Sequence, residues 1–182
     1  MNKRITFSGE TRELDQIYLF FNDTRQALTH YKQSIKKGRI VADQFIGFTP
    51  NELDEWFNQH LEELEKLVCL EMLSSTEAAL RMDYLKRIYN RKKDNLSRIF
   101  RSIYREKSAR ASLDQDILEN WKLQYPQIKS LIDDYKSLLN YRNWLAHGRY
   151  WTPKFGKRSY DHSLVFIVCK SLVENIKLLS ES

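Results

Sequence analysis

Three side chains near the C-terminus have the types and spacing of a site that moves protons beside an anion. Arg142, Asn143 and His147 lie close together in the stretch Tyr-Arg-Asn-Trp-Leu-Ala-His-Gly-Arg-Tyr-Trp. Arginine neutralises negative charge, asparagine donates and accepts hydrogen bonds, and an unperturbed histidine changes its charge near neutral pH. These three residues are the candidate catalytic residues.

Arg142 also falls at an unexpected place in the hydrophobic pattern. Apolar residues recur at helical spacing through Leu131, Tyr135 and Leu138, and the next position of that stripe is Arg142. A cation on a core stripe must pair with an acid or line a cleft that an anion or water can reach, because burying it alone is too costly. The structural alternative to a functional site is an Arg142 ion pair with an acid such as Glu77, with His147 interacting with a helix dipole.

The positive charge of the chain is concentrated in two segments. Residues 86–110 contain ten Lys or Arg and two acids, and residues 142–158 contain five Lys or Arg and no acid. The net charge is only +6, so the rest of the chain is acidic. Two basic segments on an acidic body favour a polyanionic partner, with nucleic acid as the first candidate.

Composition and motifs exclude several classes of protein. No Gly-rich phosphate loop, His/Cys metal cluster or Ser nucleophile motif is present, so we expect no cofactor and no metal. Cys69 and Cys169 lie among apolar residues and are expected in the core. No signal sequence and no apolar run of membrane-spanning length is found, which predicts a cytoplasmic protein without a membrane partner.

The scarcity of turn residues predicts an all-α fold. Five Gly and three Pro in 182 residues favour long helices over a many-stranded sheet. We expect a single domain over residues 1–182, built as an up-and-down bundle of about five to six helices with an apolar helix at the C-terminus. Residues 1–10 are expected to form a flexible N-terminal segment.

Apolar periodicity and capping signals place the first helices. The first is expected over residues 11–37, and the capping box at residues 49–52 starts the second. Ser74 and Glu77 offer the start of a third helix, although one continuous bent helix is the alternative. Residues 75–105 are expected to form an amphipathic helix with a basic stripe of five arginines: Arg87, Arg91, Arg98, Arg101 and Arg105.

The remaining helices lead to the candidate site. Ser112 caps a short helix, Pro126 begins the next one, and Gly148 ends it just after His147. Residues 148–161 form a basic and aromatic loop, and the most apolar helix of the chain follows through residues 164–179.

The motif at the candidate site resembles a known family. Arg-Asn-x-x-x-His followed by Gly resembles the signature of HEPN domains, which pair an Arg with a His. The longer string from Arg142 to Trp151 is similar to that of bacterial HEPN proteins linked to RNA cleavage and toxin systems. The Arg-to-His spacing alone is a weak signal, because Arg25 and His30 share it. That second match lacks the Asn, the Gly and the basic loop.

The resemblance implies a metal-independent endoribonuclease that acts as a toxin or as an effector of defence against phage. His147 would move a proton at the ribose 2′-hydroxyl or the leaving oxygen, and Arg142 would neutralise charge on the scissile phosphate. Asn143 would orient His147 or hold a phosphate oxygen. Residues five apart on a helix point ~140° apart and lie ~7.5 Å apart along its axis, and the family's solution is a homodimer with two motifs facing one cleft.

Helical spacing and charge add supporting residues. Glu77 and Arg81 form an i, i+4 pair, and we expect this pair to approach the site from the amphipathic helix over residues 75–105. Contacts to RNA, by charge or by stacking, are expected from Arg98, Arg101, Arg149, Tyr150, Trp151 and Lys154. HEPN toxins that are inactivated by AMP transfer carry a Tyr two residues after the His. That position is Arg149 here, so we do not expect such control, and an antitoxin or other regulatory protein is an expected partner.

Two other functional classes remain open at this point. The first is a non-catalytic HEPN module that binds RNA, a nucleotide or a partner protein. The second is a structural helical adaptor whose basic segments are solvated faces.

Overall fold

The computed structural model describes residues 4–153 and 160–181, and over these residues the chain is all helical, as predicted. In chain order the elements are α1 (Leu14–Lys36), η1 (Asp43–Phe45), α2 (Pro50–Tyr89), α3 (Asn95–Lys107), η2 (Ser108–Arg110), η3 (Leu113–Leu118), α4 (Glu119–Gln124), η4 (Pro126–Ile128), α5 (Lys129–Ala146) and α6 (His162–Glu181). No described helix is both long enough and apolar enough to cross a membrane.

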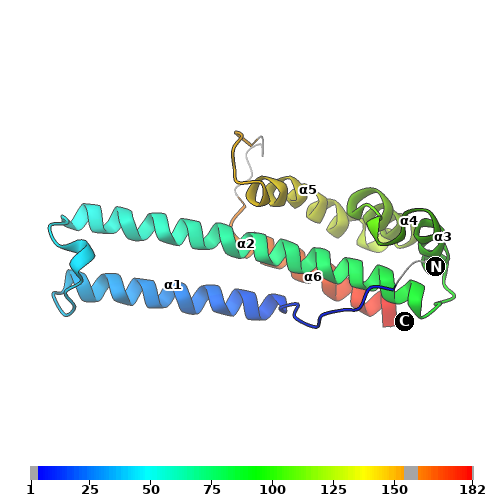
Figure 1. Ribbon diagram of the computed structural model, residues 1–182, viewed down its shortest axis with the longest axis horizontal. Coiled ribbons are helices and arrows are strands. Elements are labelled where there is room, and N and C mark those ends of the chain that lie inside the picture. The colour runs from blue at the N-terminus through cyan, green and yellow to red at the C-terminus, as the bar shows by residue number, and fades with distance from the viewer. Residues whose placement is uncertain (1–3, 154–159, 182) are drawn as a thin grey trace.

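The long helix α2 organises the bundle. It has 40 residues and packs against α1, α3, α5 and α6. Figure 1 shows α1 and α2 as an antiparallel hairpin whose closed end projects from the molecule as an arm. α6 lies beside the second half of α2, and α3, α4 and α5 form a further layer over that same half. The candidate site at the end of α5 therefore lies above the middle of α2.

α2 is one continuous helix from the predicted capping box to Tyr89. Thr49 accepts a hydrogen bond from the Glu52 amide and Pro50 occupies the first turn, as the sequence indicates. Ser74 does not begin a new helix, because buried residues such as Leu73 and Leu80 continue the apolar face on both sides of it. The helix start predicted at Ser74 is therefore wrong, and the alternative of one continuous helix over this stretch is confirmed.

The single amphipathic helix predicted over residues 75–105 is wrong. α2 ends at Tyr89, Arg91 adopts a left-handed conformation with φ of +50°, and α3 begins only at Asn95. The Asp94 carboxylate accepts a 2.9 Å hydrogen bond from the Ser97 amide and caps α3. This local cap outweighs the apolar periodicity, and the basic stripe is divided between two helices.

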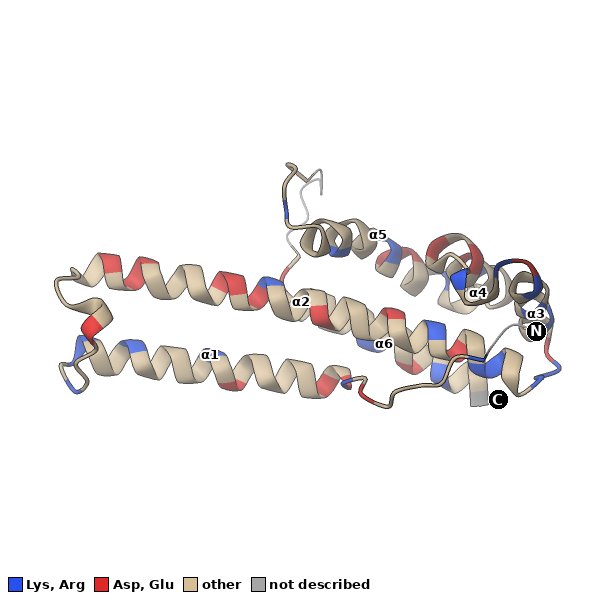
Figure 2. Ribbon diagram, viewed as in Figure 1, with Lys and Arg blue, Asp and Glu red and all other residues tan. Residues whose placement is uncertain are grey.

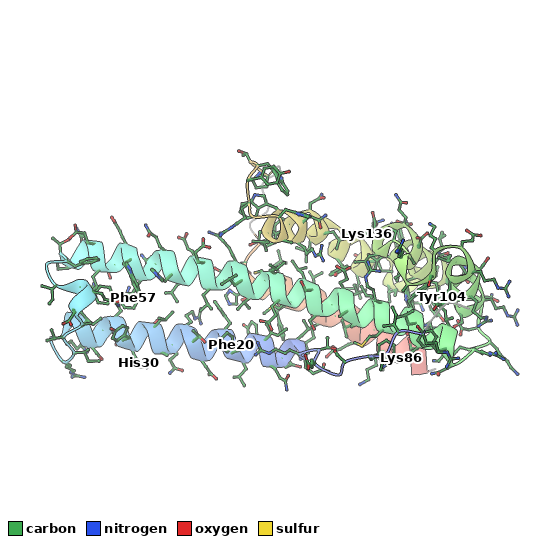
Figure 3. All side chains as sticks on the ribbon, viewed as in Figure 1. Phe20, His30, Phe57, Lys86, Tyr104 and Lys136 are labelled. Carbon is green, nitrogen blue, oxygen red and sulfur yellow. The ribbon has the colours of Figure 1, made fainter. Side chains whose placement is uncertain are left out.

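Two apolar clusters form the core. The larger one joins α1, α2 and α6 to the layer above them, and Cys69 and Cys169 are buried in it as predicted. The smaller one lies at the closed end of the arm around Phe45, Leu53 and Phe57. Phe57, labelled in Figure 3, contacts Tyr31 of α1 with ring centroids 5.8 Å apart. The arm is therefore held by its own packed cluster.

The described part of the N-terminal segment runs along the end of α2. The Ile5 amide donates to the Tyr89 hydroxyl at 3.0 Å, and the Phe7 ring lies 6.4 Å from that of Tyr89. The Ser75 hydroxyl donates to the Arg12 carbonyl at 2.7 Å. Residues 5–12 thus contact α2 at several points along its second half.

Arg87, predicted on the basic stripe, is instead a buried structural residue. It is 1 % exposed, and its guanidinium pairs with Asp83 at 2.8 Å and with Asp94 at 3.2 Å. It also donates to the Ser180 hydroxyl at 2.7 Å and lies 4.6 Å from the centre of the Trp121 ring. One side chain thereby joins α2, the α3 cap, α4 and α6.

Replacing Arg87 should destabilise the bundle strongly. We expect Arg87→Ala to lower the free energy of unfolding by about 3 kcal/mol, the lower end of the range for breaking a buried ion pair, because water can still reach Asp94. Urea unfolding measures this change. Arg98→Ala, which removes an exposed arginine from α3, should change stability by less than about 0.5 kcal/mol. Equal effects of the two variants would contradict this role of Arg87.

Candidate active site at the end of α5

The last turn of α5 and the residues after it fix the position of His147. The His147 amide donates to the Asn143 carbonyl at 3.0 Å, and the Arg149 amide donates to the Trp144 carbonyl at 3.0 Å. Gly148 has a φ of +79°, which glycine adopts without strain and which lets the chain reverse at this point. Gly148 ends the helix as predicted, and His147 is left exposed at its C-terminal end.

Arg142 forms an ion pair with Glu77, an acid of α2. Its guanidinium lies 2.8 Å from the Glu77 carboxylate, and it also donates to the Asn143 side-chain oxygen at 3.2 Å. The side chain remains 30 % exposed, although its Nε atom is buried and has no hydrogen-bond partner among the described residues. Arg142 is therefore partly buried, neutralised on one side and open to solvent on another.

Glu77 serves two arginines at once. One of its carboxylate oxygens accepts from Arg81 at 2.8 Å and the other faces Arg142 at 2.8 Å. Arg81 also donates to the Ala111 carbonyl at 3.0 Å, which ties the group to the segment before η3. The Glu77–Arg81 pair thus reaches the site from α2, and the three side chains carry one net positive charge. An anion approaching Arg142 would compete with Glu77 for the guanidinium.

The segment after α5 is anchored to α2 as well. Arg149 has a φ of +58°, which is uncommon for a residue with a side chain, and its guanidinium binds Glu63 at 2.7 Å. The indole of Trp144 donates to the Trp151 carbonyl at 2.8 Å. The His147 ring lies 6.5 Å from the Trp151 ring. Arg149, which we expect to contact RNA, therefore also anchors this segment to α2.

The remaining predicted RNA-binding residues fall into two groups. Tyr150 is 83 % exposed beside the site, and Trp151 is partly buried. Arg98 and Arg101 lie on α3, at the other end of the layer from the C-terminal turn of α5 (Figure 1). Lys154 lies outside the described residues. The structure brings together Arg142, Asn143, Glu77 and Arg81, and it does not bring the α3 arginines to them.

Two acids of α2 were missed by the reading of the sequence. Glu63 binds Arg149, and Glu65 accepts hydrogen bonds from His162, from the amide at 3.0 Å and from the ring Nδ1 at 2.6 Å. The His162 ring also lies 4.2 Å from the Phe21 ring, measured between centroids. No local signal identifies these pairs, because the partners are separated by almost a hundred residues.

The charges are distributed unevenly over the structure. Figure 2 shows acids along the first half of α2, and cations at the end of the molecule where α2 stops and α3 begins. Among the described residues, no group of three or more His, Cys, Asp and Glu is placed to hold a metal ion. The candidate site lies between these acidic and basic regions.

The Glu63–Arg149 pair should respond to acid. Hydrogen bonds from Arg149 and then from Lys66 lower the pKa of the Glu63 carboxyl to about 2, from an unfolded value of about 4.3. Because the folded pKa is the lower one, the stabilisation is complete above the unfolded pKa and is lost as the pH falls through about 2. Glu63→Gln should therefore be less stable than the wild type at pH 7 and nearly equal to it at pH 2.

Urea midpoints at several pH values measure this effect, and a neighbouring acid provides the control. Glu62 is exposed and makes no ion pair with a described residue, so Glu62→Gln, which breaks no ion pair, should be about as stable as the wild type at pH 7. A constant gap between Glu63→Gln and the wild type from pH 7 to pH 2 would show that the ion pair does not stabilise the turn.

Comparisons of the chain with family models, with curated proteins and with solved structures gave no match. The relation to HEPN domains therefore stays a prediction from the sequence motif.

Proposed function

We propose that this chain is a HEPN-type endoribonuclease that cleaves RNA without a metal ion and works as a homodimer. The observation that supports it most directly is the end of α5, where a partly exposed Arg142 is positioned by Glu77 and is followed by an exposed His147. A guanidinium and an imidazole are thus both at least partly exposed at the same helix end. The proposed role is that of a cytoplasmic toxin or anti-phage effector, held in check by an antitoxin or another regulatory protein.

The proposed reaction is transfer of the phosphate within the RNA chain. The ribose 2′-oxygen attacks phosphorus, the bond to the 5′-oxygen breaks, and a 2′,3′-cyclic phosphate is left. One histidine takes the proton of the 2′-hydroxyl, and a second proton must reach the departing 5′-oxygen. Arg142 stabilises the charge that develops on the phosphate oxygens. Asn143, in contact with Arg142, is a positioning residue in this scheme.

Two protons must move, and the described residues offer one histidine at this helix end. His147 of the partner subunit would supply the second if two copies met along this face. Large apolar side chains are exposed nearby: Leu67, one turn beyond Glu63 on α2, is 64 % exposed, and Tyr150 is 83 % exposed. A homodimer that joined two α5 ends would cover these side chains and remove apolar surface from water.

The second candidate function is an RNA-binding module that does not cleave. The ion pair of Arg142 with Glu77 favours it, because it gives the proposed catalytic arginine a structural role. Binding of RNA without cleavage, whatever residue occupies position 147, would support this second function.

Cleavage should depend on His147 and not on the similar motif in α1. In EDTA, we expect His147→Ala to slow cutting of single-stranded or structured RNA by about 10²- to 10⁴-fold, the usual contribution of a general acid or base. His30→Ala is the matched control, because Arg25 and His30 have the same spacing and His30 lies on the arm away from α5 (Figure 3). Unchanged cutting by His147→Ala would refute the proposed enzyme.

Two further readouts sharpen this experiment. Mixing the wild type with an excess of His147→Ala should suppress the activity of the wild type, because a mixed dimer would hold only one of the two histidines that the shared cleft requires. Induction of the wild type in cells should arrest growth, and induction of His147→Ala should not. Full arrest by both proteins would separate toxicity from cleavage.

The α3 surface should contribute affinity and salt dependence. Arg91, Arg101 and Arg105 line a hollow of about 360 Å³ with Ile88 and Tyr104, and Arg98 is exposed on the same helix. We expect Arg98→Gln with Arg105→Gln to weaken RNA binding and to reduce the slope of log K against log salt by about 0.7 for each lost contact to a single strand. Lys37→Gln with Arg39→Gln, an equal loss of two positive charges near the end of the arm, should change neither quantity.

A further inference from the structure

A second cavity lies far from the candidate active site, between the C-terminal halves of α2 and α6. Its volume is about 470 Å³, within the range of small-molecule sites. α1 begins only at Leu14, and in Figure 1 the segment before it crosses this end of α2 and α6. Glu13, at the start of α1, lines the cavity together with both helices. The cavity therefore continues the interhelical groove at the point where α1 stops covering it.

The walls of this cavity carry an excess of cations. Lys86, Arg87, Lys92 and Lys177 all line it, and Lys86 is labelled in Figure 3 near the end of α2. Arg87 is neutralised by its own acids, as described above. Lys86 and Lys177 are exposed and form no ion pair with a described residue. The Lys86 ammonium lies 5.9 Å from the centre of the Phe7 ring, and the acids Glu13 and Asp83 also line the cavity. Two ammonium groups on different helices, neither in an ion pair with a described residue, thus border one space that an anion could enter.

The floor of the cavity is apolar and its walls are fixed. Leu80, Val173 and Ile176 contribute aliphatic surface. Arg87 donates to the Ser180 hydroxyl at 2.7 Å, and the Lys92 ammonium donates to the Ser180 carbonyl, so the end of α6 is tied to α2 and to the segment after it. A cavity braced in this way loses little entropy when a ligand binds.

Helix dipoles explain the positions of only some of the cations that line this cavity. Lys86 and Arg87 lie in the last turn of α2, where cations are favoured. Lys92 lies beyond that helix, and Lys177 belongs to α6, yet both line the same cavity. The Asn90 side chain adds a neutral hydrogen-bonding group to the wall. Cations from three segments therefore surround one apolar floor.

We propose that this cavity binds a small phosphate monoester, with its phosphate on Lys86 and Lys177 and its apolar part against Val173 and Ile176. Lysine ammonium groups bind phosphate as point charges, and the aliphatic floor favours an apolar or aromatic substituent. The proposal is independent of RNA cleavage at α5, because it concerns other residues and is tested by ligand binding.

Titration calorimetry with the full chain tests the proposal, with 1-naphthyl phosphate as the probe. We expect saturable binding that is tighter than that of inorganic phosphate and of uncharged 1-naphthol. Lys177→Gln and Lys86→Gln should each weaken it about tenfold, as the loss of one charge-assisted hydrogen bond does. Lys129→Gln, which removes an exposed lysine of α5 outside the cavity, should bind like the wild type. Both cavity lysines are exposed, so these variants should fold.

Each other result overturns the proposal. Equal binding of 1-naphthol would indicate an apolar cavity without anion recognition, and equal binding by all variants would place the ligand elsewhere. A further arm compares a short RNA carrying a 5′-phosphate with the same RNA lacking it. If the phosphorylated RNA binds in a manner that depends on Lys86 and Lys177 and the small ester does not, the site recognises an RNA end instead of a small molecule.

Discussion

The structure depends on one constraint, which is that a single 40-residue helix must bury apolar side chains along most of its length. α1 is too short to cover all of α2, so it packs along the first half and the start of the second. α6 and the layer that contains α5 bury the remainder. Because different elements cover the two halves of α2, the closed end of the α1–α2 hairpin projects as an arm and the end of α5 lies above the middle of α2. The cavity lies where α1 no longer covers α2, next to the first residues of α1.

The acidic side chains of α2 then hold the functional region in place. Glu77 binds Arg142 on α5, Glu63 binds Arg149 in the turn after it, and Glu65 binds the first residue of α6. One helix therefore fixes both ends of the connection between α5 and α6. Outside the two basic segments the chain is acidic. Part of that negative charge serves to hold α5, the turn after it and the start of α6.

The cations serve different purposes in different places. Arg87 is a buried crosslink, whereas Arg98 is exposed and Arg101 donates to the Lys92 carbonyl at 2.5 Å. An RNA that reached both α3 and the end of α5 would have to extend over the length of α5, about 27 Å for 18 residues. The basic regions at the two ends of this layer are thus separate surfaces, and the proposed phosphate site is a third.

The sequence by itself determined the helical class, the start of α2 at its capping box, the end of α5 at Gly148 and the presence of Arg142 on a stripe of core residues. These features are encoded locally, in caps, in glycine and in a period of 3.6 residues. The break between α2 and α3 is also encoded locally, because Asp94 caps α3 through the Ser97 amide. Apolar residues continue at helical spacing on both sides of the break, and this periodicity predicted one helix. Only the tertiary structure decided that Arg87 is buried, that Glu63 and Glu65 hold the segment around α5 and α6, and that Arg98 lies far from His147. Those pairings join residues distant in the chain, and they follow from how helices pack rather than from any spacing that the sequence displays.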